Sequence, residues 1–85
     1  MASYKVLIKR SAAKELEELP LKVRRQVAGR IDSLGASPRP TGVEKLSGQE
    51  KYRIRQGDYR VLYAIDDDTQ TVTVVKIGHR RDVYR

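Results

Sequence analysis

The chain has 85 residues, and its 18 lysines and arginines outnumber 11 aspartates and glutamates, giving a net charge of +7. It has no cysteine and one histidine, which excludes disulfides, thiolate metal sites and the usual multi-histidine metal sites. The length fits a single domain over residues 1–85. The clustered positive charge predicts an anionic partner such as nucleic acid, a membrane surface or an acidic protein. We see no signal peptide and no run of about 18 apolar residues, and therefore expect a soluble cytoplasmic protein without membrane contact.

The first half of the chain predicts one strand followed by two helices. Residues 4–9 (YKVLIK) alternate apolar and polar side chains, which is typical of a strand. Ser11 is a favoured N-cap for a first helix that runs to Leu19 with apolar residues at helical spacing. Pro20 interrupts this pattern and begins a second helix, which Gly35 is expected to cap at its C-terminal end.

Strands dominate the second half. Segment 35–42 (GASPRPTG) is expected to be an irregular loop, and a short strand could follow at 43–46. Three longer alternating segments follow at 51–56, 59–66 and 71–77. The pattern predicts an α+β fold in the order β-α-α-β-β-β. We expect a twisted, mainly antiparallel sheet of about four to five strands, with the N-terminal helical hairpin packed on one face.

The segment KYRIRQGDYR predicts a hairpin whose loop is Gly57-Asp58. Counting outward from this loop places Arg55 opposite Arg60. Side-chain alternation then divides the residues between a buried face, with Tyr52, Ile54, Val61 and Tyr63, and an outer face, with Arg53, Arg55 and Arg60. A directly opposed arginine pair costs about 0.2–1 kcal/mol relative to a neutral pair. A solvated face would mix both signs of charge, whereas this one carries only cations, and paired guanidinium forks favour a phosphodiester ligand.

The C-terminal segment GHRRDVYR adds further cations and an aromatic ring. His79, Arg80 and Arg81 directly follow the last predicted strand. Histidine is the side chain best suited to proton transfer near neutral pH, although a single histidine is more often structural. Tyr84 could stack on a base, although a tyrosine near a terminus also commonly packs in a core.

Together, YRIRxGDYRVLY and GHRRDVYR resemble the toxins of bacterial toxin–antitoxin modules, specifically the RelE side of the RelE/ParE superfamily. The resemblance covers the whole chain and is most specific in its C-terminal half. It implies a type II toxin that acts as a ribosome-dependent mRNA endoribonuclease, an mRNA interferase. Such a toxin cleaves mRNA in the A site through attack by the 2′-hydroxyl, without metal or cofactor, and inhibits translation. The implied partners are an acidic cognate antitoxin, the ribosome and mRNA, with operator DNA contacted only through the antitoxin complex.

The resemblance also implies residue roles. The implied catalytic residues are Arg53, Arg55, Arg60, Arg80 and Tyr84, with Arg60 on the scissile phosphate and Tyr84 on the cleaved nucleotide. Further RNA contacts are implied for Lys51, Arg81 and Arg85. Some relatives carry lysines at positions 53 and 55, and arginine effectively cannot release a proton as lysine can. Arg53 and Arg55 are therefore expected to act electrostatically, which leaves proton transfer to His79, Tyr84 or the ribosomal RNA.

Two other functions stay open. One is a ParE-like gyrase poison, which has the same fold and no nuclease chemistry. The clustered arginines argue against it, because they suit an RNA backbone. The other is a non-catalytic ribosome- or RNA-binding module, which the lack of an obvious general base favours.

Overall fold

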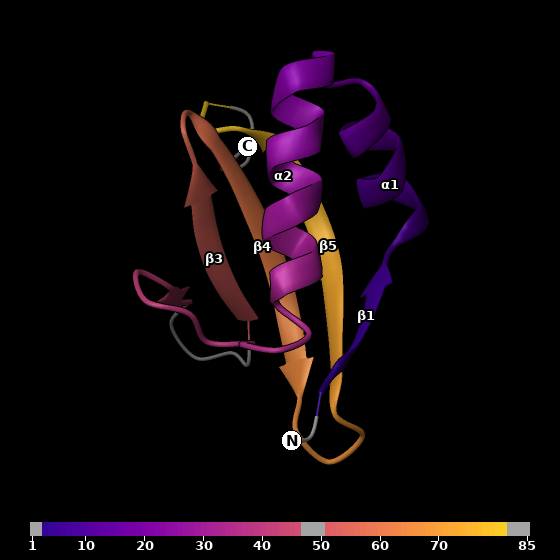
Figure 1. The fold of residues 1–85 in the computed structure, drawn as a ribbon, viewed down its shortest axis with the longest axis vertical. Coiled ribbons are helices and arrows are strands. Elements are labelled where there is room, and N and C mark those ends of the chain that lie inside the picture. The colour runs from indigo at the N-terminus through magenta and orange to yellow at the C-terminus, as the bar shows by residue number, and fades with distance from the viewer. Residues whose placement is uncertain (1–2, 47–50, 82–85) are drawn as a thin grey trace.

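The computed structural model describes residues 3–46 and 51–81, in which two helices cover one face of a five-stranded sheet (Figure 1). The elements are β1 (Lys5–Ile8), α1 (Arg10–Glu17), α2 (Leu21–Ser33), β2 (Glu44–Lys45), β3 (Lys51–Gln56), β4 (Tyr59–Asp66) and β5 (Thr71–His79). This architecture confirms the predicted α+β fold, in which the two helices follow the first strand and precede the remaining strands along the sequence.

The strands lie in the order β1-β5-β4-β3-β2. Consecutive strands from β2 to β5 pair antiparallel, and β1 pairs parallel to β5 at the other edge of the sheet. The parallel strands β1 and β5 must be joined by a crossover connection. The first part of this connection is formed by α1 and α2 (Figure 1). The sheet is therefore mixed, with one parallel pair in an otherwise antiparallel arrangement.

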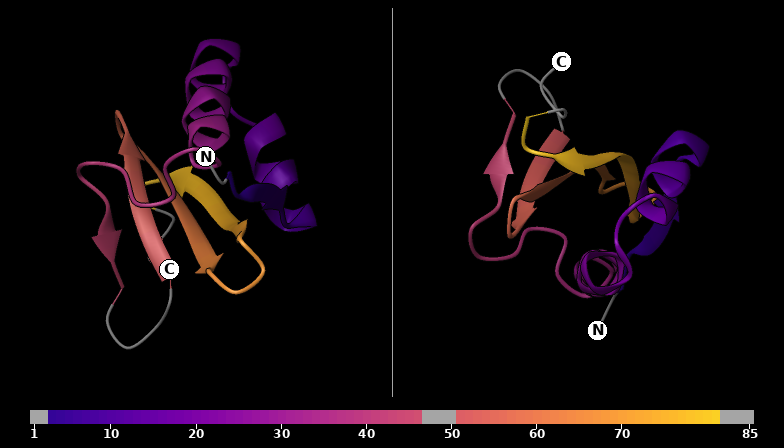
Figure 2. Two further views of the ribbon diagram at one scale, coloured as in Figure 1. Left: turned by 60° about the horizontal axis from the view of Figure 1, so that its bottom comes forward. Right: turned by 90° about the horizontal axis from the view of Figure 1, so that it is seen from above.

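The hydrophobic core lies between the helices and one face of the sheet, as the view along α2 shows (Figure 2, right). Its members include Val27 and Ile31 from α2 and Tyr52, Ile54, Val61 and Tyr63 from the hairpin, none of them more than 5% exposed. Strand side chains alternate between faces, so the arginines of β3 and β4 point to the opposite face. Neither helix of the described residues covers that face, which we call the open face.

Both helices are short and amphipathic. α1 places the fully buried Ala12 in the core, and α2 continues through Val27 and Ile31 at helical spacing. No helix in residues 3–46 or 51–81 is long and apolar enough to cross a membrane.

The first helix begins earlier than its capping pattern predicts. α1 starts at Arg10, and Lys9 occupies the N-cap position without a side-chain cap. The Lys9 N–H donates to the Val74 carbonyl (2.9 Å), so the chain passes from strand pairing directly into the helix. Ser11 lies within the first turn, and its prediction as N-cap was therefore wrong.

Gly35 also has a different role from the predicted cap. Gly35 directly follows the C-cap residue Leu34, the usual place of a capping glycine, but it lacks the positive φ of such a cap. Its carbonyl accepts a hydrogen bond from the Tyr4 N–H (2.7 Å). A Cβ at position 35 would lie 3.0 Å from the Tyr4 carbonyl oxygen and 3.3 Å from Val6 Cγ2. Glycine is therefore needed here because β1 approaches the backbone closely.

Candidate phosphodiester-binding site

The β3–β4 hairpin has the predicted register. Arg55 pairs with Arg60, and Ile54 pairs with Val61. Gly57 has φ +60°, and Asp58 does not have a positive φ, which is the pattern of a type II′ turn with glycine at its first central position. The alternation on each side of this loop determines which side chains reach the open face.

Four arginines gather beside this loop. Arg53, Arg55 and Arg60 lie on the open face, and the Arg80 N–H donates to the Asp58 carbonyl (2.9 Å), which brings the tail next to the hairpin. Burial lowers the pKa of Arg60, and the charges of Arg55, Arg53 and Arg80 lower it further. We call Arg53, Arg55, Arg60 and Arg80 the arginine cluster. Strand pairing and the hydrogen bond from Arg80 to the hairpin loop bring these four predicted site residues together.

The neighbours of the cluster differ along the sheet. Arg60 lies beside Gly78 of β5, which has no side chain, and its Nη1 donates to the Gly57 and Tyr59 carbonyls (3.2 and 3.1 Å). Arg53 lies beside Glu44 of β2, and its Nη2 donates to the Glu44 carboxylate. Sequence analysis missed Glu44, because alternation within a two-residue strand cannot reveal its register against β3.

Two of the three predicted RNA-binding cations, Lys51 and Arg81, lie in the described residues near this cluster. Lys51 pairs with Ala64 at the start of β3 and shares the open face with Arg53. Arg81 is exposed, and its N–H donates to His79 Nδ1 (3.3 Å). Tyr84 and Arg85 lie outside the described residues, so their roles stay predictions.

His79 lies on the other face of the sheet. β5 continues to His79, beyond the predicted end of the strand, because His79 pairs with Tyr59. Both side chains fall on the helix face by alternation, and their rings meet edge-on at 5.6 Å. They line a pocket of about 280 Å³ together with Glu15 of α1 and Glu18, the C-cap residue of that helix. The structure therefore does not bring the His79 ring into the arginine cluster.

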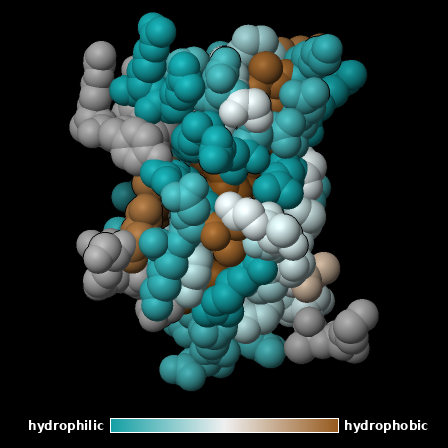
Figure 3. Space-filling model, turned by 90° about the vertical axis from the view of Figure 1, so that its left-hand side faces the viewer, coloured by the Kyte–Doolittle hydropathy of each residue, from teal (hydrophilic) through white to brown (hydrophobic). Residues whose placement is uncertain are grey.

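The side of the molecule that carries β3 is predominantly hydrophilic, with small apolar patches (Figure 3). Glu44, Lys51 and Arg55 are exposed at this side of the sheet, and Arg53 is half-buried. A polar, extended ligand therefore suits this surface better than an apolar one.

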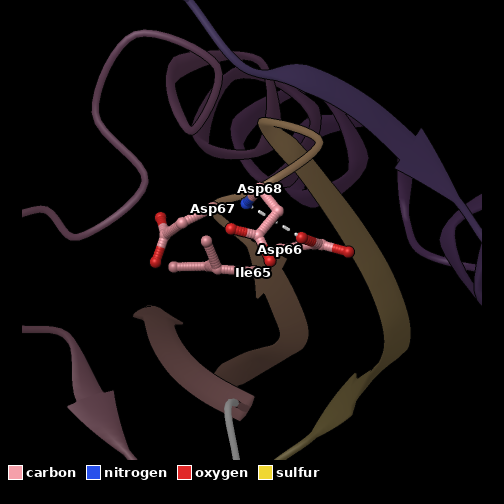
Figure 4. A pocket seen from close by; sticks show the side chains of 4 residues that line it. All are labelled: Ile65, Asp66, Asp67 and Asp68. Atoms are coloured by element: carbon pink, nitrogen blue, oxygen red, sulfur yellow. Dashed lines mark hydrogen bonds between the residues drawn. The ribbon is translucent and has the colours of Figure 1, made fainter.

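A second pocket, of about 460 Å³, lies at the β4–β5 turn and is acidic (Figure 4). It is lined by Ile65, Asp66, Asp67 and Asp68. The Asp66 carboxylate accepts hydrogen bonds from the Asp68 and Thr69 N–H groups (3.0 and 3.2 Å), so it serves the turn itself. Three adjacent carboxylates repel phosphate, so this pocket does not suit a phosphodiester. Among residues 3–46 and 51–81, no group of three or more histidine, cysteine or acidic residues could hold a metal ion.

An ion pair anchors the 35–42 loop near the same turn. Arg39 Nη2 lies 2.9 Å from Asp67 Oδ2, and the Tyr4 hydroxyl donates to Asp67 Oδ1 (2.7 Å). The hydrogen bonds from Arg39 and Tyr4 hold the pKa of Asp67 below its usual range. Arg39 Nε also donates to the Tyr52 hydroxyl (3.2 Å), which ties this network to β3, the strand that bears Arg53 and Arg55.

The fold and the cluster define a class of small basic α+β proteins whose helices cover one sheet face and whose arginines occupy the other. The sequence profile of the family described as "ParE toxin of type II toxin-antitoxin system, parDE" matches residues 6–84. Toxin RelG of Mycobacterium tuberculosis (strain H37Rv) is 33% identical, over 96% of this chain and 97% of the relative. Toxin RelE of the same strain is 34% identical, over 96% of this chain and 87% of the relative.

Solved structures are similar over nearly the same length. A chain of the toxin–antitoxin complex RelBE2 from Mycobacterium tuberculosis superposes with a TM-score of 0.82 at 28% identity, covering 93% of this chain and 100% of its own. The isolated E. coli RelE toxin superposes with a TM-score of 0.81 at 27% identity, covering 96% and 92%. The chain belongs to the RelE/ParE superfamily and is a type II toxin–antitoxin toxin of the RelE family.

Proposed function

We propose that this toxin is a ribosome-dependent endoribonuclease that cleaves mRNA in the A site without a metal ion and thereby inhibits translation. The observation that carries the proposal is the arginine cluster on the open face, with Arg60 between Arg55 and Gly78 in the sheet. A rigid sheet that presents several guanidinium groups on one face is suited to hold a phosphodiester.

In the proposed reaction the mRNA 2′-hydroxyl attacks the adjacent phosphate, leaving a cyclic phosphate and a free 5′-hydroxyl. The arginine cluster stabilises the negative charge that develops on the pentavalent phosphorane. Arg60 contacts the scissile phosphate, and Arg53, Arg55 and Arg80 contribute further charge. One preorganised donor in such a position typically contributes about 2.7–4 kcal/mol to transition-state stabilisation.

The residues around the cluster hold the RNA in this proposal. Lys51, Arg81 and Arg85 contact the RNA backbone, and Tyr84 stacks on the cleaved nucleotide. Proton transfer by His79 would require its ring to reach the open face, whereas the ring packs edge-on against Tyr59 on the helix face. The His79 ring is therefore not placed to accept the proton of the 2′-hydroxyl.

The proposed protein partner is an acidic antitoxin that covers the arginine cluster. A net charge of +7 and the cluster of like charges favour an acidic partner. Solved relatives include the RelB–RelE complexes of E. coli and of Pyrococcus horikoshii, which share 25% and 28% identity with this chain. The toxin acts in the cytoplasm on the ribosome and mRNA, and it meets operator DNA only as part of the antitoxin complex.

The test is primer extension on mRNA bound to ribosomes, with EDTA present. The wild-type chain should produce discrete cuts in the A-site codon, cut free RNA much more slowly, and halt growth unless the neighbouring antitoxin is co-expressed. Arg60→Ala should lower the cleavage rate by about 100- to 1000-fold. Lys22→Ala, a change to an exposed cation on α2, is the control and should cleave normally. Ribosomes arrested without any mRNA cut would instead support a non-catalytic ribosome-binding module.

The description of the matching family, which names parDE, favours a second candidate function, a ParE-like gyrase poison. The two functions separate in a cell-free translation extract that carries out no DNA replication. An mRNA endoribonuclease stops protein synthesis there, and a gyrase poison does not.

A further inference from the structure

Glu44 places a carboxylate against the arginine cluster. It lies on β2, directly beside Arg53 of β3, and its Oε2 accepts a hydrogen bond from Arg53 Nη2. The Glu44 side chain is 48% exposed, while that of Arg53 is 20% exposed. An accessible carboxylate therefore lies at the edge of the surface that we propose holds the phosphodiester.

The proposed cleavage needs a group that accepts the proton of the 2′-hydroxyl. The arginines cannot do so, because they stay protonated at any working pH. The His79 ring lies on the helix face. Of the carboxylates in the described residues, Glu44 contacts a member of the cluster directly, and Asp58 in the hairpin loop acts on Arg60 through its charge.

We propose that Glu44 is the general base of the cleavage reaction, an inference that rests on the proposed function. The Glu44 carboxylate takes the proton of the 2′-hydroxyl as the bond from O2′ to phosphorus forms. The bond from phosphorus to O5′ then breaks, and a solvent water protonates the departing oxygen. The hydroxide left by that water takes the proton from Glu44, which restores the carboxylate.

The contact with Arg53 suits this role. Arg53 holds Glu44 through Nη2, and Arg55 follows two residues later on the same face of β3. The carboxylate is therefore fixed at the edge of the guanidinium groups that we propose bind the phosphate. Among the described residues of β2 and β3, Glu44 pairs with Arg53, Lys45 follows it on β2, and Lys51 and Arg55 lie two residues from Arg53 on the same face of β3.

The decisive variant is Glu44→Gln, which retains the size of the side chain and an acceptor for Arg53 but cannot take a proton. Single-turnover mRNA cleavage is measured on preformed ribosome complexes from about pH 6 to about pH 9. The wild-type rate should change little with pH. The rate of Glu44→Gln should fall by about 100- to 10,000-fold at pH 7. It should then rise about tenfold per pH unit, because hydroxide must replace the lost base.

Two matched variants complete the design. Glu44→Asp keeps a carboxylate and should retain the flat pH profile at a reduced rate. Glu18→Gln, at the C-cap of α1 on the helix face, should match the wild type in rate and profile. The melting temperatures of all variants should agree closely with that of the wild type, because substitutions at exposed positions change stability little.

Three results would overturn the inference. A slow Glu44→Gln with a flat profile would mean that Glu44 only orients Arg53. A hydroxide-dependent profile in Asp58→Asn, with Glu44→Gln unaffected, would make Asp58 the base. A wild-type chain that cuts no mRNA, or that still cuts mRNA with a 2′-deoxy residue at the scissile position, would overturn the proposed function and the role of Glu44 with it.

Discussion

Arg55 and Arg60 face each other across β3 and β4, and the charges of Arg53 and Arg80 also reach Arg60. Burial and these three like charges lower the pKa of Arg60, so its charged form is less stable in the free protein than in water. Two backbone carbonyls offset part of this cost by accepting hydrogen bonds from Arg60. A bound anion would relieve the repulsion among these arginines. The cluster therefore suits anion binding better than it suits the stability of the free protein.

Arg55→Thr separates these two effects. The change replaces an opposed like-charge pair with a good strand former, so the free energy of unfolding should stay equal or rise by a few tenths of a kcal/mol. The ribosome-bound cleavage rate should fall, and Arg60→Ala should lower it further. Lys51→Thr is the stability control. Lys51 lies opposite Ala64, so this substitution relieves no repulsion between directly opposed like charges. Lower stability of Arg55→Thr with unchanged cleavage would show that the arginines support the fold instead.

The protonated Tyr63 hydroxyl contributes to the free energy of unfolding, and this contribution is lost at alkaline pH. Its hydroxyl donates to the Pro38 carbonyl (2.7 Å), and burial raises the pKa of Tyr63 to about 12. The folded state therefore holds this proton more tightly than the unfolded chain. The stabilisation is fully present below the usual tyrosine pKa of about 10 and is lost as the pH rises towards 12.

Tyr63→Phe tests this term through the pH dependence of chemical denaturation. At neutral pH the variant should be less stable by about 0.5–1.5 kcal/mol, because a hydrogen bond is lost and the Pro38 carbonyl loses its donor. Between about pH 10 and about pH 11.5 the wild type should lose stability more steeply than the variant, so their curves converge. Parallel curves over this range would contradict the assignment to Tyr63.

At the level of elements, the β3–β4 loop positions the cluster. Gly57 takes up the left-handed conformation of the loop (φ +60°), and Asp58 accepts the hydrogen bond that brings Arg80 beside the hairpin. A change in this turn would therefore affect the strand register and the position of the tail together. The strands themselves are held from the core side by their buried tyrosines and aliphatic residues.

Two glycine substitutions should have opposite effects. Gly57→Ala forces a left-handed conformation on a residue with a Cβ and should destabilise the fold by about 1 kcal/mol, even though that Cβ would meet nothing within 4 Å. Gly29→Ala, in the interior of α2, also meets nothing within 4 Å and should stabilise the fold by about 0.5–1 kcal/mol. Urea denaturation measures both. Equal effects at the two positions would mean that the loop does not depend on the left-handed conformation.

For the whole molecule, the sheet separates two functions. One face carries the helices and the core, and the other carries the arginine cluster and Lys51. Stability and binding can therefore vary independently, except where the repulsion within the cluster links them.

This link predicts a specific effect of oxyanions. Sodium phosphate should raise the melting temperature of the wild type more than sodium chloride at equal ionic strength, because phosphate binds the folded cluster and chloride mainly screens it. Arg60→Ala should show a smaller difference between the two salts. The same difference in both proteins would attribute the effect to general exclusion of phosphate from protein surfaces.

The amino-acid sequence alone determined the hairpin and its two faces. A two-residue loop leaves one register, and the side-chain period of two then assigns Tyr52 to the core and Arg53, Arg55 and Arg60 to the outer face. These features are local, so pattern and turn chemistry suffice. The motifs in this half also carried the resemblance to the RelE family, which the comparisons confirm.

Only the tertiary structure decided the features that depend on contacts between distant segments. The parallel pairing of β1 with β5 led the chain into α1 at Arg10, and the same strand approaches Gly35. The pairing of β5 with β4 extended the last strand and set the His79 ring on the helix face. The register of β2 placed Glu44 beside Arg53. Each outcome depends on how one element packs against another, because such pairings leave no periodic signal within either segment.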